Sequence, residues 1–218
     1  LNSDGTTATL IKFTGTTANV PERIEIGKDG PSYTVTAIGG SAFATIDYRD
    51  NHIDNIYLQS VNLPDTITEI GDHAFYKCKN AAFTSITIPD DVTEIKDDTF
   101  GFCTSLQKVV LPMRLTTIGN HAFYECTALT SITLSEAKDL TTIRQGAFAS
   151  CTQLSKVILP EGLNKVEDGA FAVSGLTDIT LPKSLKEVGE FVFASVAPGG
   201  IQTVTYTGTK KDWDNLVN

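Results

Sequence analysis

The sequence has no long hydrophobic run and little positive charge. Its 218 residues contain nothing near the roughly 18 apolar residues of a membrane span, and no stretch arranged like a signal peptide. Lys and Arg number 17 against 26 Asp and Glu, so the net charge is −9 and no basic stripe is available for phosphates. We expect a soluble chain that binds neither nucleic acid nor membrane. Because the chain starts at Leu1 and not at Met, we expect a preceding segment to carry the cellular address.

Catalytic motifs are also missing. The sequence contains no Gly-x-Ser-x-Gly, no His-Glu-x-x-His, no phosphate-binding loop of the Walker type and no Gly-x-Gly-x-x-Gly. Carboxylate pairs such as Asp90-Asp91 and Asp97-Asp98 are typical of solvated surfaces. We therefore expect no enzymatic activity and no cofactor.

The sequence does contain a repeat that is anchored on phenylalanine. Its Phe residues are separated by 32, 25, 23, 25, 23 and 22 positions, and Ile or Val stands five residues before each one. Upstream, two aliphatic residues one position apart are usually followed by Pro, as in Val109, Leu111 and Pro112. A fixed period of roughly 20 to 50 residues is typical of a solenoid. The repeat Phe residues are Phe43, Phe75, Phe100, Phe123, Phe148, Phe171 and Phe193.

The repeat unit is similar to a known one. Its core reads Leu106-x-x-Val109-x-Leu111 and recurs together with Leu-Pro, Ile-Gly, Ala-Phe and Cys. Over about residues 24–208 the chain resembles the BspA-type leucine-rich repeats of bacterial surface proteins. We expect an α/β fold: a right-handed leucine-rich-repeat solenoid of about eight short parallel strands, ~4.8 Å apart, with short helical or extended segments on the other side and a cap at each end.

Each unit should contribute one strand, a second extended piece, and about one helical turn around Ala-Phe-x-x-Cys. Asp72, Asp98 and Asn120 stand where a side-chain oxygen could cap such turns. Because side chains alternate along a strand, we expect two inward aliphatic rows, with the Phe row closing the far side. The first row is Ile86, Val109, Ile132, Val157, Ile179 and Val204, and the second is Ile88, Leu111, Leu134, Leu159 and Leu181.

We expect a single domain over residues 1–218, with an N-terminal cap and partial repeat at 1–37, repeats at 38–204 and a C-terminal cap at 205–218. In the C-terminal cap, a helix should start near Thr209–Asp212 and place Trp213 as a lid over the core. An exposed Trp213 that acts as a platform for sugars is the alternative.

The N-terminal cap should contain four features. Residues 1–8 are small and polar and should be frayed, and residues 9–14 are prone to form a short strand. Ile24 and Ile26 fit the strand pair of an incomplete first repeat, and the turn signal at residues 28–31 predicts a hairpin.

Cysteine occurs only in one slot of the repeat, three residues after Phe. Ser174 occupies this slot in a later unit, so the position favours a small buried side chain over sulfur chemistry. Neighbouring Cα atoms would lie within disulfide reach, but parallel Cα–Cβ vectors oppose pairing, so we expect free thiols and keep disulfides as the alternative. The cysteines are Cys78, Cys103, Cys126 and Cys151.

Two histidines also belong to the repeat. His73 and His121 lie five residues before a cysteine, but the residues around them match as well, and Asp98 fills the same slot in the unit between. Repetition accounts for this likeness, so we expect no metal site.

Two surfaces are candidates for ligand binding. On the outer face of the strands, Lys and hydroxyl side chains stand beside β-branched residues, although such residues also simply suit a strand. The second surface is a nine-residue surplus within residues 44–57, which should leave the solenoid as a loop. The candidates are Lys108, Val110, Ser131, Thr133, Lys156 and Ile158 on the strands, and Tyr48 and Arg49 in the loop.

These observations favour an extracellular or cell-surface interaction module of the adhesion type. The resemblance to bacterial surface proteins implies that it binds a host or matrix protein or a glycan, and we expect a monomer. The alternative is a structural spacer with no ligand of its own.

Overall fold

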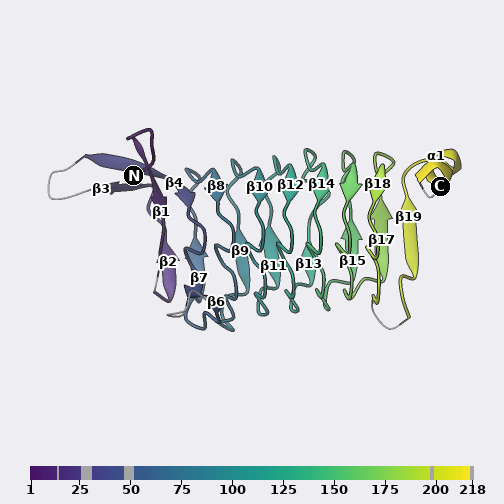
Figure 1. Ribbon diagram of the computed structural model, residues 1–218, viewed down its shortest axis with the longest axis horizontal. Coiled ribbons are helices and arrows are strands. Elements are labelled where there is room, and N and C mark those ends of the chain that lie inside the picture. Colours follow the sequence, from purple (N-terminus) through teal and green to yellow (C-terminus); the bar gives the residue numbers. More distant parts are fainter. Residues whose placement is uncertain (14, 26–30, 47–51, 197–198, 217–218) are drawn as a thin grey trace.

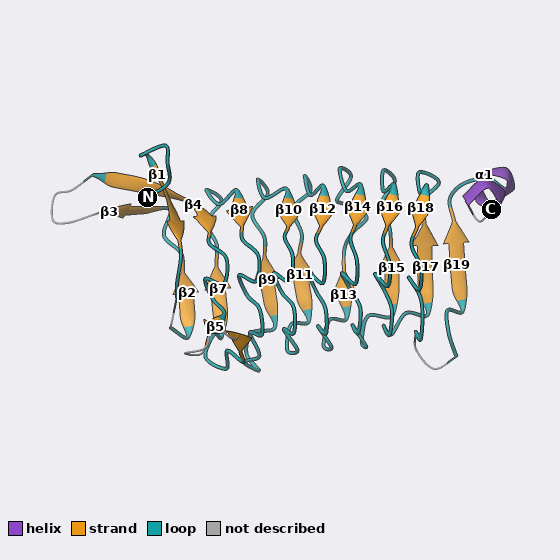
Figure 2. Ribbon diagram, in the orientation of Figure 1, coloured by secondary structure: helices purple, strands orange, loops and turns teal. Residues whose placement is uncertain are grey.

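The protein is an elongated solenoid of short parallel strands, as its computed structural model shows (Figure 1). The structure describes residues 1–13, 15–25, 31–46, 52–196 and 199–216. Successive turns of the chain stack side by side along the long axis, and two rows of strands follow that axis (Figure 2).

The first row of strands, which we call the ribbon, follows the predicted pattern. Most neighbouring strands pair one repeat apart, so that Val109 lies between Ile86 and Ile132. The eight described strands agree with the predicted number. They are β2 (Thr17–Asn19), β7 (Ser60–Asn62), β9 (Ser85–Thr87), β11 (Lys108–Val110), β13 (Ser131–Ile132), β15 (Lys156–Ile158), β17 (Asp178–Leu181) and β19 (Thr203–Tyr206).

The second row holds the residues that end at the repeat Ile or Val. It begins with β4 (Ser32–Ile38), which pairs with β8, and continues as a five-stranded parallel sheet from β10 to β18. The strands after β4 are β8 (Glu69–Ile70), β10 (Glu94–Ile95), β12 (Thr117–Ile118), β14 (Thr142–Ile143), β16 (Lys165–Val166) and β18 (Glu187–Val188).

The core lies between these rows and is closed by the Phe row, as the sequence predicts. From Phe43 to Phe193 the rings stack with centroids 4.6 to 6.0 Å apart and planes within 15° of parallel. The aliphatic rows are buried too, except for Leu111, which is partly buried, and Val204 at the C-terminal end, which pairs with Ile179 but is 52% exposed. Val204 therefore does not belong to the buried row as predicted, because no following repeat covers it.

The predicted helical turns around Ala-Phe-x-x-Cys are wrong, and the solenoid is mostly strand rather than α/β. In these segments alternate N–H groups bond to the next repeat, as Phe123 N–H does to the Ala147 carbonyl over 2.8 Å. The residue two before the repeat Phe has positive φ in every unit, and so does the residue two after it in every unit but the first, for example His121 at 53° and Glu125 at 54°. A helix requires negative φ at every residue, so the segments form successive tight turns.

The predicted helix caps are therefore wrong as well. Asp98 itself has a φ of 52° and starts no helix. A carboxylate still accepts hydrogen bonds at this edge, but from the next repeat. Asp97 accepts them from the Asn120 backbone N–H over 2.7 Å and from the Asn120 side-chain amide over 2.9 Å.

The N-terminal cap differs from the prediction at its start. Residues 1–8 are not all frayed, because β1 (Thr7–Leu10) pairs in parallel with β4 and Ala8 is only 2% exposed. β3 (Arg23–Glu25) pairs antiparallel with β4 and confirms the hairpin. Ile24 therefore lies in the hairpin and not in the ribbon, whose first strand is β2. Ile26 lies outside the described residues.

The described part of the 44–57 insertion forms a small two-stranded element beside the solenoid. β5 (Thr45–Ile46) pairs antiparallel with β6 (His52–Ile53). Asn55 then returns the chain to the stack, because its side-chain amide donates to the Phe43 carbonyl over 2.6 Å.

The C-terminal cap is a short helix, α1 (Lys210–Leu216). Its start is predicted correctly: Thr209 and Asp212 exchange hydrogen bonds, with the Thr209 N–H donating to the carboxylate over 2.8 Å and the Asp212 N–H donating to the hydroxyl over 3.2 Å. Trp213 packs edge-on against Tyr206, with centroids 5.3 Å apart, but remains half-buried. It is a partial lid, since Val204 stays exposed.

Candidate functional site

The structure brings six of the predicted site residues together on the outer face of the ribbon. They come from β11, β13 and the residue after it, and β15, and all six are exposed. Each flanks a buried partner in its strand: Val109, Ile132 and Val157 are 3%, 6% and 1% exposed. Alternation along the strand therefore fixes their outward direction. The six are Lys108, Val110, Ser131, Thr133, Lys156 and Ile158.

The two predicted loop residues, Tyr48 and Arg49, lie outside the described residues. The ribbon thus carries the candidate site in the part of the chain that the structure describes.

The hydrogen-bonded ladder of the ribbon has two interruptions among the described strands, one between β7 and β9 and one in the middle of this site. β13 pairs with β11, and β15 pairs with β17, but no pairing joins β13 to β15. The cause is local. Ser135 replaces the usual Pro, and two surplus residues make the bend longer: the Ala137 N–H bonds to Leu134 and the Leu140 N–H to Ala137. β13 consequently ends at Ile132, one residue earlier than β11 does.

A shallow hollow of about 230 Å³ lies at this interruption. The hollow forms where the strands β13 and β15 are not joined by backbone hydrogen bonds. Its walls combine hydroxyl groups, one ammonium group and apolar side chains. Such a site fits a small group that accepts and donates hydrogen bonds around an apolar patch. The hollow is lined by Thr130, Ser131, Ile132, Thr133, Leu134, Ser135, Lys156 and Ile158.

The charge next to the hollow is mixed. The Thr177 hydroxyl donates to the Asp178 carboxylate over 2.7 Å and holds the pKa of that carboxyl below its usual value, and the nearby positive charge of Lys156 acts in the same direction. An ammonium and a carboxylate from adjacent strands therefore stand side by side at the rim.

A larger hollow of about 450 Å³ lies on the second row, near β16 and β18. Its central cation is already engaged: Lys165 lies 3.4 Å from Glu167 and 3.3 Å from Glu187, and these partners raise its pKa. We do not place the candidate site there, because exposed ion pairs of this kind are typical of a solvated face.

The cysteines are free and buried, as predicted. Their thiols donate hydrogen bonds to the carbonyl of the Phe one repeat earlier, as Cys126 does to Phe100 over 3.2 Å. Burial raises the pKa of the Cys151 thiol to about 12. A neutral thiol that already has a partner suits a structural role and not a nucleophilic one.

The histidines do not form a metal centre with their neighbours. His73 lies 3.7 Å from the Asp98 carboxylate, and burial raises the pKa of that carboxyl, which His73 and His121 partly oppose. Within the described ranges, no group of three or more His, Cys, Asp or Glu side chains could hold a metal ion.

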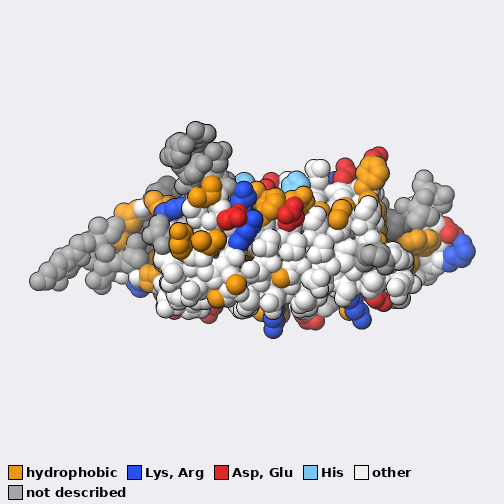
Figure 3. All heavy atoms as spheres, turned by 90° about the horizontal axis from the view of Figure 1, so that it is seen from below, with side chains coloured by type: hydrophobic (Ala, Val, Ile, Leu, Met, Phe, Trp, Pro, Cys, Tyr) orange, Lys and Arg blue, Asp and Glu red, His pale blue; other side chains and the backbone are white. Residues whose placement is uncertain are grey.

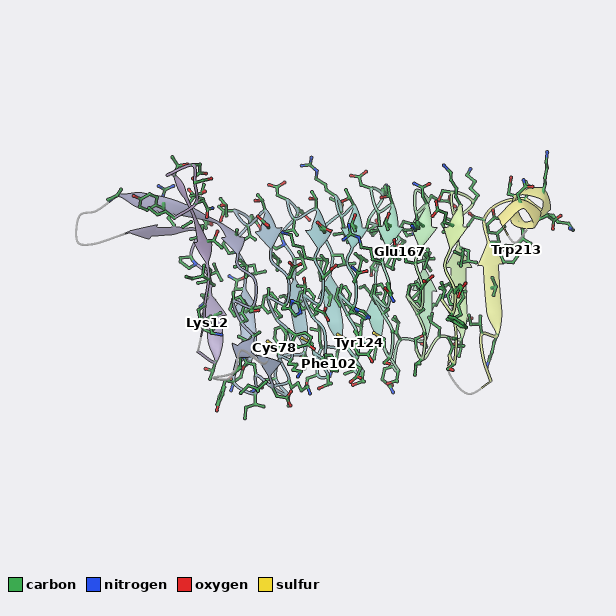
Figure 4. The ribbon with its side chains drawn as sticks, viewed as in Figure 1. Lys12, Cys78, Phe102, Tyr124, Glu167 and Trp213 are labelled. Carbon is green, nitrogen blue, oxygen red and sulfur yellow. The ribbon has the colours of Figure 1, made fainter. Side chains whose placement is uncertain are left out.

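The sequence reasoning missed a second surface. It lies on the turns around the repeat Phe residues, at the edge of the solenoid away from the second row. Tyr76, Phe102 and Tyr124 form a line of contacting rings there, and the latter two are labelled in Figure 4. We call these three residues the aromatic ridge. The signal was available: Tyr76 and Tyr124 share a repeat slot, and Gly101 fills it in the unit between.

No helix in the described part of the chain has the length and apolarity of a membrane crossing. A comparison with curated protein sequences finds no match to the chain. Several solved bacterial structures are similar to it, all at low sequence identity, and they support the fold alone.

Three of these structures are representative. A leucine-rich repeat protein from Eubacterium ventriosum is 22% identical, with a TM-score of 0.55 over 92% of this chain and 47% of that one. The pneumococcal vaccine antigen PcpA is 24% identical, with a TM-score of 0.53 over 89% and 41%. A leucine-rich repeat protein from Bacteroides ovatus is 22% identical, with a TM-score of 0.51 over 87% and 59%. The chain thus spans about half the length of these proteins.

The sequence family gives the more specific assignment. Six copies of one repeat match, over residues 31–82 and 79–197, which is most of the chain and includes every strand of the candidate site. The protein belongs to the BspA-type leucine-rich-repeat family.

Proposed function

We propose that this protein is an extracellular interaction module of a bacterial surface protein, and that it binds a host or matrix protein or a glycan through the ribbon. The observation that carries the proposal is the coincidence of exposed Lys, hydroxyl and apolar side chains with the interrupted ladder between β13 and β15. Membership of a family whose repeats resemble those of bacterial surface proteins supports the location.

The physical basis is a rigid scaffold with a variable outer face. One continuous core runs from Ala18 to Val192, so the strand positions are fixed before a ligand arrives. A pre-ordered surface loses little conformational entropy on binding. The outer positions of the strands can then differ between repeats at little cost in stability.

A structural spacer is the second candidate. It is favoured by the same continuous core, which makes a stiff rod whether or not anything binds to the ribbon. The two candidates differ in one respect: a spacer should tolerate any substitution on the outer face.

The test is binding of the immobilised chain to a glycan array and to purified fibronectin, collagen, laminin and mucin. We expect at least one probe to bind, and Lys156→Glu to weaken it roughly tenfold or more, as for a central interface residue. Lys211→Glu on α1 makes the same change in charge at the C-terminal end of the solenoid, beyond β19 and away from β11, β13 and β15, and should bind normally. Absence of binding to every probe would contradict the function, and binding unaffected by ribbon variants would contradict the site.

A further inference from the structure

The aromatic ridge departs from the repeat pattern. The residue directly after the repeat Phe is small in five units out of seven, and only Tyr76 and Tyr124 are large. The slot is occupied by Ala44, Tyr76, Gly101, Tyr124, Ala149, Ala172 and Ala194. Since small residues satisfy the fold in most units, stacking of the solenoid does not require aromatic rings at this edge.

The ridge is packed as a unit. A Cβ atom at Gly101 would lie 3.0 Å from the Tyr76 ring, so glycine makes room for that ring to lie over the next repeat. Phe102, one residue later, then contacts both tyrosines edge-on, with centroids 5.4 Å from Tyr76 and 5.1 Å from Tyr124. Three consecutive repeats thus present one line of half-buried rings.

Phe102 also occupies an unfavourable backbone position. Its φ is +60°, a region that bulky side chains rarely adopt. A glycine would relieve the strain, yet the chain has a large aromatic residue there. The same slot has positive φ in the other units from Lys77 to Ser195, so the turn requires this conformation, and only the aromatic side chain is particular to Phe102.

Positive charge accompanies the rings. The Lys77 ammonium lies 5.5 Å from the Tyr76 ring centroid and 5.7 Å from that of Phe102, and the Lys79 ammonium lies 5.9 Å from Phe102. Lys79 also pairs with Asp54 over 2.9 Å. Burial raises the pKa of the Tyr76 hydroxyl, and the carboxylates of Asp98 and Glu125 act in the same direction, so the two ammonium groups are concentrated at Phe102.

Figure 3 views the molecule from the side of these turns. Hydrophobic side chains gather there in a band, with both Lys or Arg and Asp or Glu side chains among them. The labelled Phe102 and Tyr124 lie at this edge of the ribbon drawing as well, away from the second row (Figure 4).

We propose that the aromatic ridge is a docking surface for a protein segment that presents an apolar side chain bordered by carboxylates. The lysines select the acidic border, and the rings receive the apolar side chain. The ring planes of Tyr76 and Phe102 meet at 80°, so the ridge offers no flat platform for stacking a sugar chain. The proposal adds a second surface to the proposed function and does not depend on the ribbon.

The experiment begins with a display library of random twelve-residue peptides selected on the wild-type chain. The most enriched sequence is then made as a synthetic peptide and its affinity is measured. We expect enriched peptides to carry Asp or Glu next to Phe, Leu or Trp. Phe102→Ala and Lys77→Glu should each weaken binding roughly tenfold or more, and binding should weaken as salt is raised.

Controls separate this surface from the ribbon and from folding. Lys156→Glu on the ribbon and Lys211→Glu on α1 should bind the peptide like wild type, and Lys77→Glu tests the ridge without truncating a packed ring. Peptides without acidic residues, or binding that ignores Phe102 and Lys77, would overturn the proposal. So would hyaluronan or heparin binding that requires Phe102 in the absence of any ridge-dependent peptide, which would assign the ridge to an acidic glycan. None of these results affects the binding test of the ribbon.

Discussion

The Cys126 thiol donates a hydrogen bond to the Phe100 carbonyl, one repeat earlier, over 3.2 Å. That carbonyl also accepts the N–H of Cys103 over 3.1 Å, so both of its lone pairs are used inside the core. The same arrangement recurs at Cys103 with Phe75 and at Cys151 with Phe123. Cysteine is present here as a small apolar side chain that can still donate one hydrogen bond.

The first prediction concerns this bond. Cys126→Ala removes a buried donor and a fully buried sulfur atom, and should lower the free energy of unfolding by about 1–3 kcal/mol. Cys126→Ser retains a donor, which can bond within its own unit as Ser174 does to the Phe171 carbonyl over 2.7 Å, and should lose less. Urea denaturation of both variants measures the difference. Equal losses would show that the hydrogen bond contributes nothing.

The second prediction concerns alkaline pH. The folded pKa of Cys151 is raised to about 12 by burial, from 9.0 for an exposed thiol. Above pH 9 the unfolded chain releases this proton while the folded chain keeps it, so stability falls as pH rises from about 9 towards 12. Denaturation at pH 8 and pH 10.5 should show the loss, with a smaller slope in Cys151→Ala. An identical slope in that variant would contradict the assignment.

The third prediction concerns the glycine of Ile-Gly. A Cβ atom at Gly119 would lie 2.7 Å from the Lys96 carbonyl carbon and 2.8 Å from the Asp97 nitrogen. Backbone cannot move aside as a side chain can, so Gly119→Ala should cost about 1–3 kcal/mol. Gly40→Ala is the control, since among the described residues the only neighbour of its Cβ within 4 Å is the Asp72 carbonyl oxygen, at 3.2 Å. Thermal unfolding of both variants provides the comparison, and a harmless Gly119→Ala would refute the clash.

The fourth prediction concerns the C-terminal cap. Trp213 is half-buried, so Trp213→Ala should cost about 1–2 kcal/mol, less than the loss of a fully buried ring. In a one-dimensional stack the effect should remain local. Amide exchange should show lower protection in β17 and β19 while β9 and β11 stay protected. Uniform loss along the chain, or none, would mean that Trp213 is not even a partial lid.

The sequence was sufficient for the stack itself, because each repeat places its aliphatic and Phe residues at fixed spacings. It was not sufficient for the turns. A single helical turn and a pair of tight turns place Ala122 and Phe123 inside equally well, and only the hydrogen bonds to the next repeat distinguish them. The sign of φ at His121 is not visible in a hydrophobic pattern.

The candidate sites illustrate the same limit. Alternation along the strands was enough to place Lys108 and Lys156 on the outer face. The missing ladder between β13 and β15 follows from how a longer bend is accommodated, and the sequence reveals only that the bend is longer. The aromatic ridge was overlooked because Phe102 lies one position away from the slot of Tyr76 and Tyr124, so aligned repeats do not reveal a continuous line of rings.

The interrupted ladder also determines how the solenoid can bend. On the opposite side, β14 pairs with β12 and β16, so hydrogen bonds cross the level of the gap without a break. At this level the second row therefore acts as a hinge line that stays hydrogen-bonded, and the ribbon is the side that can open. Bending that opens the hollow stretches no ladder bond between β13 and β15, whereas bending in the opposite sense must compress packed side chains. The width of the hollow is thereby coupled to the curvature of the whole rod.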